Sequence, residues 1–393
     1  MIYPDGPAMA RLEAHMTVTQ GPSEPRRPDK AGALPAASFL PSGTSILRGV
    51  SLLLLGLLAV TPPRASATDP ERPGQSSFLT RAVFADGRLW VLSDAGDLSS
   101  VTEARDARIA EALPEKAFDL CARDGHPLVI TGANGNGSMW TLRQRTEGSW
   151  SVAAAIPTEG DGLLAMDCTA NKVTLLTSRR LIDVDGRSAI TLSGRLGQAR
   201  VSSTYGTPDQ VFVGLSAGEW GGGLRRIDRR TGNITVIERN STGELCGGPL
   251  NTSCDPVTGI AAEPWNPDCF AVTIGLVHMQ PHGRVVEVCG DRVQRLYDKP
   301  YGNNRSAGRN KDDAPFISVA FFGLARDGDA VLAVGIDGIY RIGPGGAAQV
   351  PLPHFENIGR ISVSFELPHV VLVLTNLNQR LSISGATPLL VPR

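Results

Sequence analysis

Residues 269–289 read CFAVTIGLVHMQPHGRVVEVC. The segments CFAVTIGL and RVVEVC are apolar runs of strand length, rich in β-branched residues. Between them, VHMQPHG (277–283) has the composition of a connecting loop. This pattern predicts an antiparallel pair of strands. Cys269 and Cys289 are symmetric about the loop, so the pairing places them opposite each other and predicts a disulfide.

Similar apolar runs recur along the chain, mostly at intervals of about forty residues, which is the period of a propeller blade. They read RLWVLS (88–93), PLVIT (127–131), KVTLLT (172–177), QVFVGL (210–215), AVLAVGI (330–336) and VVLVLTN (370–376). Continuous rather than alternating apolar runs are typical of strands covered on both faces, and further strands with tight turns flank each run. We therefore predict an all-β fold, a β-propeller of about seven four-stranded antiparallel blades, with six or eight as alternatives.

The composition divides the chain into three parts. Residues 1–45 are rich in Pro, Ser, Gly and Ala without apolar periodicity, so we expect them to be disordered or to lie before the true translation start. Residues 46–67 resemble a signal peptide, with the apolar run GVSLLLLGLLAV and the cleavage motif Ala65-Ser66-Ala67; an uncleaved anchor or a buried helix is the alternative. Residues 68–393 form the propeller domain, with blades expected at about 78–114, 115–160, 161–197, 198–253, 254–311, 312–353 and 354–393.

Charge and cysteine content limit the partners and the compartment. The chain has 38 Lys+Arg and 39 Asp+Glu, so no excess of one sign attracts nucleic acid or an anionic membrane. All 6 cysteines follow the predicted signal peptide, which indicates disulfides and a secreted or periplasmic protein. We expect the protein to be a monomer. Spacing pairs Cys269 with Cys289 and Cys246 with Cys254, and elimination pairs Cys121 with Cys168. The chain has no CxxC pair, so no zinc site is predicted.

The segments ADGRLWVLSDAGDL (85–98) and ARDGDAVLAVGIDGIYRI (325–342) resemble blades of bacterial sensor-type and quinoprotein-like propellers. The resemblance also extends to WD40-like blades, although the GH…WD dipeptides of WD repeats are missing. It implies a propeller and assigns no catalytic residue, and no specific family is identified.

The forty-residue period is interrupted by two insertions, at residues 240–257 and 298–316. The connections SAGEWGGG (216–223) and VHMQPHG (277–283) belong to the same blades, and all four segments should meet on one face. We therefore predict a binding site on the loop-rich rim of blades 4–6. Its candidate residues are Glu219, Trp220, Gly221, Gly222, His278, His282, Arg305 and Asp312.

Each candidate has a structural alternative. Trp220 could serve as a ligand platform beside Glu219, or it could cover the apolar end of its blade. His278 and His282 have metal-ligand spacing, but Pro281 excludes a regular helix that would hold them on one face. They could still form a metal site with neighbouring Asp or Glu residues, and the alternative is that they are solvated loop histidines, so no metal is assigned. The motif GLSAG (214–218) matches a nucleophile elbow, but the EWGGG (219–223) that follows it cannot start a stable helix, so no catalytic residue is assigned.

These observations favour an exported binding or interaction module that holds a protein or small-molecule ligand on one propeller face; a cofactor cannot be named. The alternative is a propeller hydrolase or lactonase with a metal-assisted site in the central channel. Such an enzyme would need carboxylates and imidazoles from several blades, whereas the polar excess here belongs to neighbouring blades. A stoichiometric divalent ion in the purified protein would favour the enzyme.

The first prediction concerns the leader. N-terminal sequencing of the exported protein should begin at or near Thr68, because a signal peptidase cleaves after small residues such as Ala65 and Ala67. An exported form that still contains residues 52–58 would contradict this prediction.

Overall fold

The structure is a computed structural model and describes residues 79–101, 109–132, 137–169, 172–239, 246–278, 280–302, 317–351, 361–364, 370–375 and 387–392. All of them belong to one compact unit, Thr68–Arg393. The named elements in this unit are β-strands and one short 3-10 helix, η2 (Gly218–Trp220). In these residues no helix has the length and apolar character needed to cross a membrane.

Six antiparallel sheets each contain four strands that follow one another in chain order, and we call them blades 1–6. Blade 1 comprises β1 (Leu79–Ala85), β2 (Arg88–Ser93), β3 (Leu98–Val101) and β4 (Ile109–Ala110); blade 2 comprises β5 (Lys116–Arg123), β6 (His126–Gly132), β7 (Met139–Thr146) and β8 (Ser149–Pro157); blade 3 comprises β9 (Leu163–Asp167), β10 (Thr174–Thr177), β11 (Arg180–Asp183) and β12 (Ser188–Thr191).

Blade 4 comprises β13 (Arg200–Gly206), β14 (Gln210–Ser216), β15 (Gly222–Asp228) and β16 (Ile234–Ile237); blade 5 comprises β17 (Val257–Ala262), β18 (Cys269–His278), β19 (Gln280–Cys289) and β20 (Arg292–Tyr297); blade 6 comprises β21 (Phe321–Asp327), β22 (Ala330–Gly335), β23 (Gly338–Gly343) and β24 (Gly346–Pro351). A further sheet of three described strands follows: β25 (Ile361–Ser364), β26 (Val370–Thr375) and β27 (Thr387–Pro392).

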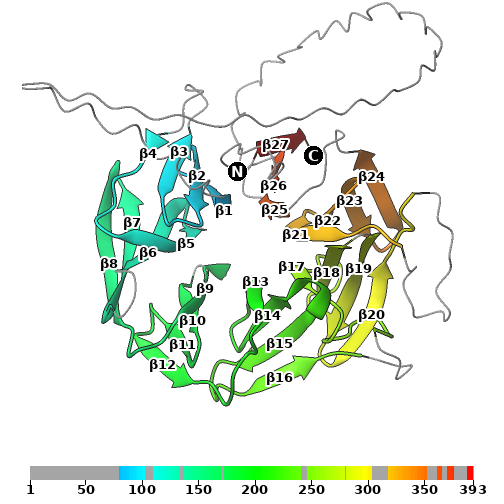
Figure 1. Cartoon of the computed structure of the whole chain (residues 1–393), viewed down its shortest axis with the longest axis horizontal. Coiled ribbons are helices and arrows are strands. Elements are labelled where there is room, and N and C mark those ends of the chain that lie inside the picture. The colour runs from blue at the N-terminus through cyan, green and yellow to red at the C-terminus, as the bar shows by residue number, and fades with distance from the viewer. Residues whose placement is uncertain are drawn as a thin grey trace, which may run out of the picture. The chain divides into compact units, whose positions relative to one another are not determined.

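The sheets are arranged as a propeller (Figure 1). The first strand of each sheet contacts the first strand of the next, from β1 through β5, β9, β13, β17 and β21 to β25, and β25 contacts β1. The predicted all-β propeller with antiparallel four-stranded blades is therefore confirmed. The predicted count needs a correction: six sheets have four strands, and the sheet built around the run VVLVLTN has three among the described residues.

Neighbouring blades bury the continuous apolar runs from both sides, as the sequence predicted. In β6, Leu128, Val129 and Ile130 are fully buried, although they point alternately to opposite faces of the sheet. Leu128 and Ile130 pack in a cluster with side chains of blade 3, whereas Val129 packs with side chains of blade 1. Burial on both faces explains why these strands lack an alternating polar pattern.

Each of the six first strands carries an extra residue near its start, where its pairing with the second strand shifts register. Such an insertion is a β-bulge. In three blades the bulge residue has a hydroxyl that donates to backbone carbonyls: Thr80 to Leu92, Ser202 to Gly214, and Thr258 to Thr273. Ser202 and Thr258 also donate to the first strand of the next blade, at Val257 and Phe321. The bulges therefore connect blades as well as strands.

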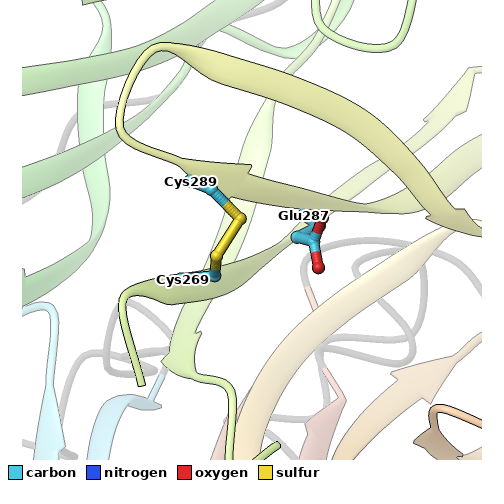
Figure 2. Close-up of side chains that lie close together, drawn as sticks. All are labelled: Cys269, Glu287 and Cys289. Carbon is cyan, nitrogen blue, oxygen red and sulfur yellow. A yellow bond between two sulfur atoms is a disulfide. The ribbon is translucent and has the colours of Figure 1, made fainter. Parts of the chain in front are cut away.

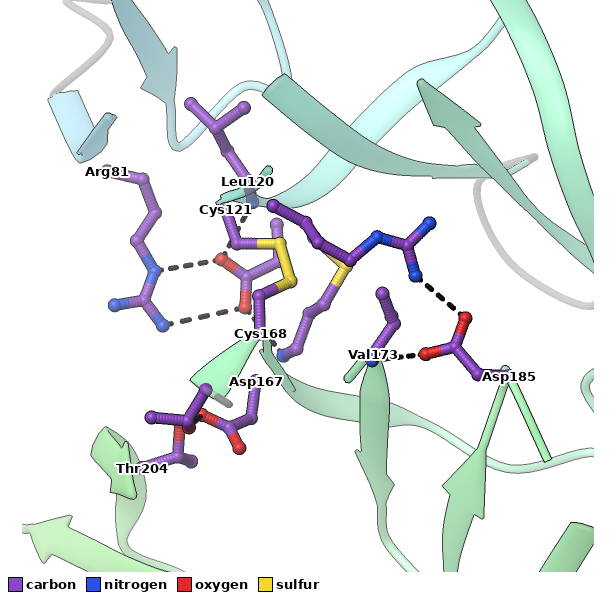
Figure 3. Close-up of a disulfide and its surroundings, with 12 residues drawn as sticks. Arg81, Leu120, Cys121, Asp167, Cys168, Val173, Asp185 and Thr204 are labelled. Carbon is purple, nitrogen blue, oxygen red and sulfur yellow. Dashed lines mark hydrogen bonds and ion pairs between the residues drawn. A yellow bond between two sulfur atoms is a disulfide. The ribbon is translucent and has the colours of Figure 1, made fainter. Parts of the chain in front are cut away.

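Three disulfides cross-link the propeller, and they join the pairs that the sequence predicted. Cys269 and Cys289 are direct partners on β18 and β19, with Cα atoms 4.4 Å apart (Figure 2). Cys121 of β5 joins Cys168, which follows β9, so this bond links blades 2 and 3 (Figure 3). The cross-link between blades constrains the unfolded chain over 47 residues of sequence separation.

A buried carboxylate fixes the entry to blade 3. Asp161 precedes β9, and its side chain is fully shielded from solvent. It accepts hydrogen bonds from Arg179 Nε at 2.5 Å, Arg180 Nε at 2.7 Å and Thr177 Oγ1 at 3.0 Å. Burial alone would raise the pKa of Asp161, but the donors from Arg179, Arg180, Thr177 and Ser178 outweigh it and lower the pKa to about 2.

A second prediction follows from this network. Asp161→Asn should lower the free energy of unfolding at pH 7 by about 2 kcal/mol, because it removes charge-assisted hydrogen bonds. The pKa of Asp161 is lowered in the folded state, so its contribution is present above the unfolded pKa of about 4 and is lost as the pH falls toward 2. Urea denaturation of the wild type and the variant at several pH values measures the difference.

The matched control is Asp329→Asn, which removes a carboxylate whose side chain is 87% exposed and pairs with Arg341. Solvent screens this pair, so the control should change stability little at any pH. A difference between Asp161→Asn and wild type that stays constant from pH 7 to pH 2 would contradict the prediction.

Candidate functional site

Three segments meet at one end of blades 4 and 5: the β14–β15 connection with η2, residues 246–256, and the tip of the β18–β19 hairpin. Helix η2 contacts β18. The backbone N–H of Gly222 donates to Thr252 O at 2.9 Å, and that of Gly223 donates to Asp255 O at 2.9 Å. We call this end the rim site and define it by Glu219, Trp220, Gly221, Thr252 and His278.

The side chains of two predicted residues contact each other across the rim site. Glu219 lies in η2 and His278 is the last residue of β18. The Nδ1 atom of His278 is 2.6 Å from Oε2 of Glu219, and the two side chains are about half exposed. A contact between two side chains this exposed contributes little to stability, so its main effect is to hold the two side chains together on the surface.

Trp220 is 77% exposed, more than any other large apolar side chain in the described residues. Its side chain therefore does not cover the apolar end of its blade. The backbone beneath it is held by local hydrogen bonds: Ala217 N donates to Gly221 O at 2.7 Å, and Gly221 N donates to Gly218 O at 3.1 Å. The indole thus projects into solvent from a fixed turn.

The glycines after Trp220 allow a close approach between backbones. Gly221 has a φ of 76°, in the region that glycine favours, and a Cβ there would overlap the carbonyl of Thr252. A Cβ on Gly222 would overlap the carbonyl of Leu215. Gly221 therefore allows the turn to pack against residues 252–254, next to the Cys246–Cys254 disulfide, and Gly222 allows β15 to pack closely against the end of β14.

The structure corrects the predicted loop at residues 277–283. The strands continue into this segment, with β18 ending at His278 and β19 beginning at Gln280, and Val277 pairs with Pro281. Proline has no backbone N–H, yet it is compatible with β19 at position 281. The pairing of β19 with β20 ends at Val285 and Tyr297, so β20 needs no N–H donor from Pro281. The connection is therefore a projecting hairpin rather than a long loop.

The two predicted histidines have different partners. His278 pairs with Glu219, whereas Nε2 of His282 lies 3.0 Å from Nη1 of Arg284. The structure thus does not direct both imidazoles to a common ligand. Arg305 and Asp312, the other predicted site residues, lie outside the described residues.

A buried ion pair beneath the rim site was missed by sequence reasoning. Nη2 of Arg284 on β19 lies 2.5 Å from Oδ2 of Asp255, and the two side chains are 2% and 1% exposed. Arg284 also donates from Nε to Pro249 O at 2.7 Å, and Asn251 N donates to the same Asp255 oxygen at 2.6 Å. Arg284 therefore attaches the inserted segment to the hairpin.

Burial raises the pKa of Asp255, while Arg284 and the Asn251 N–H act in the opposite direction. The sequence contained one indication of this pair, an arginine within the apolar run GRVVEVC. A strand that is buried on both faces can hold an arginine only if the charge has a partner.

A second buried polar group lies at the opposite end of β18, around the Cys269–Cys289 disulfide (Figure 2). Glu263 is 1% exposed and Glu287 is 7% exposed. Burial, with the charge and hydrogen bonding of Glu287, raises the pKa of Glu263 to about 8. Within the described part of the chain, the one group of three or more clustered His, Cys, Asp or Glu donors is Cys269, Glu287 and Cys289. It lies within blade 5 and does not gather residues from several blades.

Apolar side chains are exposed at the same sheet ends as the rim site. The bulge residues of blades 2 and 3 are Phe118 and Leu164, each 42% exposed, where blades 1, 4 and 5 have hydroxyl residues. Met139, at the start of β7, is 40% exposed. In blade 4 the bulge lies opposite Leu215, close to the β14–β15 connection that carries Trp220. The bulges therefore lie at the same end of the sheets as the rim site.

Comparisons with known proteins agree with the fold. No protein-family model and no curated protein matches the chain. A solved structure of U3-55K is 12% identical, with a TM-score of 0.50, covering 81% of this chain and 97% of that one. The β-propeller domain of the Trilobed protease from Pyrococcus furiosus is 9% identical, with a TM-score of 0.44, covering 80% of this chain and 93% of that one.

A third similar structure is the extracellular domain of a protein described as a hybrid two component system, from B. thetaiotaomicron. It is 13% identical, with a TM-score of 0.46 and coverage of 76% of this chain. The chain spans only 37% of the length of that structure. The chain is a β-propeller. Of these three structures only that of U3-55K reaches a TM-score of 0.50, and at 12% identity the similarity bears on the fold alone.

A third prediction tests the attachment of the inserted segment. Arg284→Met should lower the free energy of unfolding by about 3–5 kcal/mol, because it leaves the Asp255 carboxylate buried without its partner. Denaturant unfolding gives the loss of stability, and limited proteolysis should show faster cleavage within residues 246–255.

The control is Arg226→Met, which breaks a pair with Asp291 whose carboxylate is 85% exposed, and it should have a small effect. The double variant Arg284→Met/Asp255→Leu should recover part of the stability, since it removes both charges. If Arg284→Met were no more destabilising than Arg226→Met, the anchoring role of Arg284 would be wrong.

Proposed function

We propose that the chain is an exported interaction module whose rim site contacts a protein partner. The observation that carries this proposal is Trp220, an indole that is 77% exposed on a backbone fixed by hydrogen bonds and close glycine packing. An exposed tryptophan contributes nothing to the core, and aromatic anchors of this type dominate the binding energy of many interfaces.

The rigidity of the surrounding backbone supports a binding role. The Cys246–Cys254 disulfide, the Arg284–Asp255 pair and the Gly222–Thr252 hydrogen bond all restrain segments around Trp220. A partner that binds such a surface would not need to order it first, which lowers the entropic cost of association. Glu219 and His278 would supply a polar edge that fixes the orientation of the partner.

The distribution of exposed apolar side chains supports a partner of protein size. Phe118, Met139, Leu164, Trp220 and Val277 are exposed at the ends of strands or in connections. The remaining large apolar side chains that are exposed in the described residues belong to the last strands of their blades: Val152, Val236 and Val350. A surface that extends over several blades matches the area of a protein interface better than that of a small-molecule pocket.

Export is part of the proposal. Disulfides form and persist in oxidising compartments, and three of them cross-link this domain. The apolar run at residues 49–60 and the small residues that follow it favour cleavage of a signal peptide and release of the propeller into the periplasm or the medium. The hydrolase or lactonase alternative would need metal ligands from several blades, and no observation in the described residues favours it over binding.

A fourth prediction tests the rim site. Trp220→Ala should weaken binding of the native partner by roughly thirtyfold, the loss expected for an aromatic anchor worth about 2 kcal/mol. The partner is first isolated by cross-linking to the full chain in the exported fraction, and affinities are then measured by titration. The melting temperature should stay close to that of the wild type, because the indole is exposed.

The matched control is Val152→Ala, which truncates an apolar side chain that is 58% exposed on the last strand of blade 2. It should leave the affinity unchanged. An equal affinity for wild type and Trp220→Ala would refute the rim site, and a large drop in melting temperature for Trp220→Ala would show that the indole serves packing instead.

A further inference from the structure

The buried carboxyl groups of Glu263 and Glu287 face each other at the end of blade 5 that lies far from the rim site. Glu263 directly follows β17, and Glu287 lies on β19, two residues before Cys289. Both side chains are almost completely shielded from solvent, and a side-chain hydrogen bond joins them. Two ionised carboxylates are both acceptors and cannot bond to each other, so this contact requires one proton between them.

The other contacts of the two groups place that proton on Glu263. Oε2 of Glu287 accepts a hydrogen bond from Nε2 of Gln294 on β20 and lies 3.6 Å from Nη2 of Arg292. Both contacts favour the ionised form of Glu287. No N–H or O–H group of any other described residue donates to the carboxyl oxygens of Glu263, so a charge there would be buried without compensation. Glu263 is therefore the donor of the shared proton, and Glu287 is its acceptor.

The surrounding charges agree with this assignment. Burial is the largest cause that raises the pKa of Glu263; the charge and hydrogen bond of Glu287 raise it further, Arg292 lowers it, and the result is a pKa of about 8. The other ionisable residues at this end of the packed strands are Asp268 before β18, Arg326 and Asp327 at the end of β21, and Tyr205 at the end of β13. The proton is thus retained at neutral pH and released under mildly alkaline conditions.

Glu263 begins the connection to β18, residues 263–268, which packs onto the next blade. The backbone N–H of Glu263 donates to Cys269 O at 3.2 Å, and that of Cys269 donates to Asn266 O at 3.0 Å. Trp265 packs against the apolar cluster between blades 5 and 6. The Cys269–Cys289 disulfide joins β18 to β19 beside Glu287 (Figure 2), so these strands would stay cross-linked if the connection moved.

We propose that Glu263 and Glu287 form a proton-operated latch: one shared proton holds the 263–268 connection closed, and loss of that proton releases the connection and withdraws Trp265 from blade 6. Without the proton, two buried negative charges lie in contact beside a single cation, Arg292, and their repulsion drives Glu263 toward water. The disulfide confines the change to the connection. The latch therefore couples the pH of the surroundings to the exposure of an indole at the end of blade 5 opposite the rim site.

Infrared and fluorescence spectroscopy of the full mature chain test the proton and the release. A protonated carboxyl group has a carbonyl band separate from that of carboxylates, and wild type at pH 7 should show such a band that Glu263→Gln lacks. The emission of Trp265, taken as the difference between wild type and Trp265→Phe, should change with a midpoint near the pKa of about 8. In the Glu263→Gln background it should stay constant, because the glutamine amide donates to Glu287 at every pH.

Stability provides an independent measure of the same proton. Folding raises the pKa of Glu263 from its ordinary value of 4.5, so the unfolded chain releases the proton first as the pH rises. The stability that the proton confers is therefore complete below the unfolded pKa and is lost as the pH rises through the folded pKa. Urea denaturation should show the folding equilibrium constant of wild type, relative to Glu263→Gln, falling by about tenfold or more between pH 5 and pH 8.

Two further variants should shift the emission midpoint in opposite directions, which a merely structural role would not do. Glu287→Gln removes the neighbouring charge and supplies an amide donor, so the midpoint should move to lower pH. Arg292→Met removes the cation that lowers the pKa of Glu263, so the midpoint should move to higher pH. The control Glu147→Gln, in the exposed β7–β8 turn, should leave it unchanged. Circular dichroism confirms that each variant is folded.

Three outcomes would overturn the latch. The first is identical infrared spectra for wild type and Glu263→Gln at pH 7, which would place no proton on Glu263. The second is a Trp265 emission that stays constant up to pH 9 in folded wild type, or that changes equally in Glu263→Gln. The third covers a Glu263→Gln variant that does not fold: the decision then rests on Glu287→Gln and Arg292→Met, and an unchanged midpoint in both would refute the proposal.

Discussion

The fold depends on one packing constraint: each sheet is covered on both faces by its neighbours, and the first strands approach closely. In blade 5, a Cβ on Gly259 would lie 2.7 Å from Leu324 N of blade 6, and one on Gly275 would overlap the backbone of Phe321. Such contacts leave no room for larger residues and bury the apolar runs completely. Hydrogen bonds also join the first strands of neighbouring blades. Asp119 of blade 2 accepts hydrogen bonds from Arg81 of blade 1 at 2.8 Å and from Met166 N of blade 3 at 2.8 Å.

The rim site combines this rigid scaffold with an inserted segment that has little regular structure of its own. Arg284, a strand residue, helps to hold residues 246–256 through the carboxylate of Asp255 and the backbone carbonyl of Pro249, together with the Cys246–Cys254 disulfide and the hydrogen bonds from Gly222 and Gly223. Arg284 also contacts His282 through Nη1, whereas His278 contacts Glu219. The position of Trp220 therefore rests on interactions made in blade 5, although the residue belongs to blade 4.

The sequence was sufficient for the fold class and for the Cys269–Cys289 and Cys246–Cys254 pairs, because apolar periodicity and close spacing are local properties. The Cys121–Cys168 pair, which links two blades, followed only by elimination. It was insufficient where the outcome depended on contacts between blades. The segment 277–283 contains a proline and looked like a loop, but pairing with β18 extends it as a strand. Arg284 and Glu263 are single charged residues whose importance depends on burial and on partners distant in sequence. The rim residues Glu219 and His278 were identified individually, but the contact between their side chains could not be derived without the register of the hairpin.

The recurring bulges have a consequence for recognition. The first strand of each blade is the edge strand of its sheet, with one side unpaired, and Figure 1 shows these strands around the centre of the propeller. An unbroken edge would be a template for strand addition, either by a peptide or by another copy of the chain. The extra residue in each of the six first strands interrupts the regular row of backbone donors and acceptors and twists the strand locally. The centre of the propeller is thereby protected against edge-to-edge aggregation, and an extended peptide finds no continuous ladder there. Recognition is left to side chains at the ends of the strands.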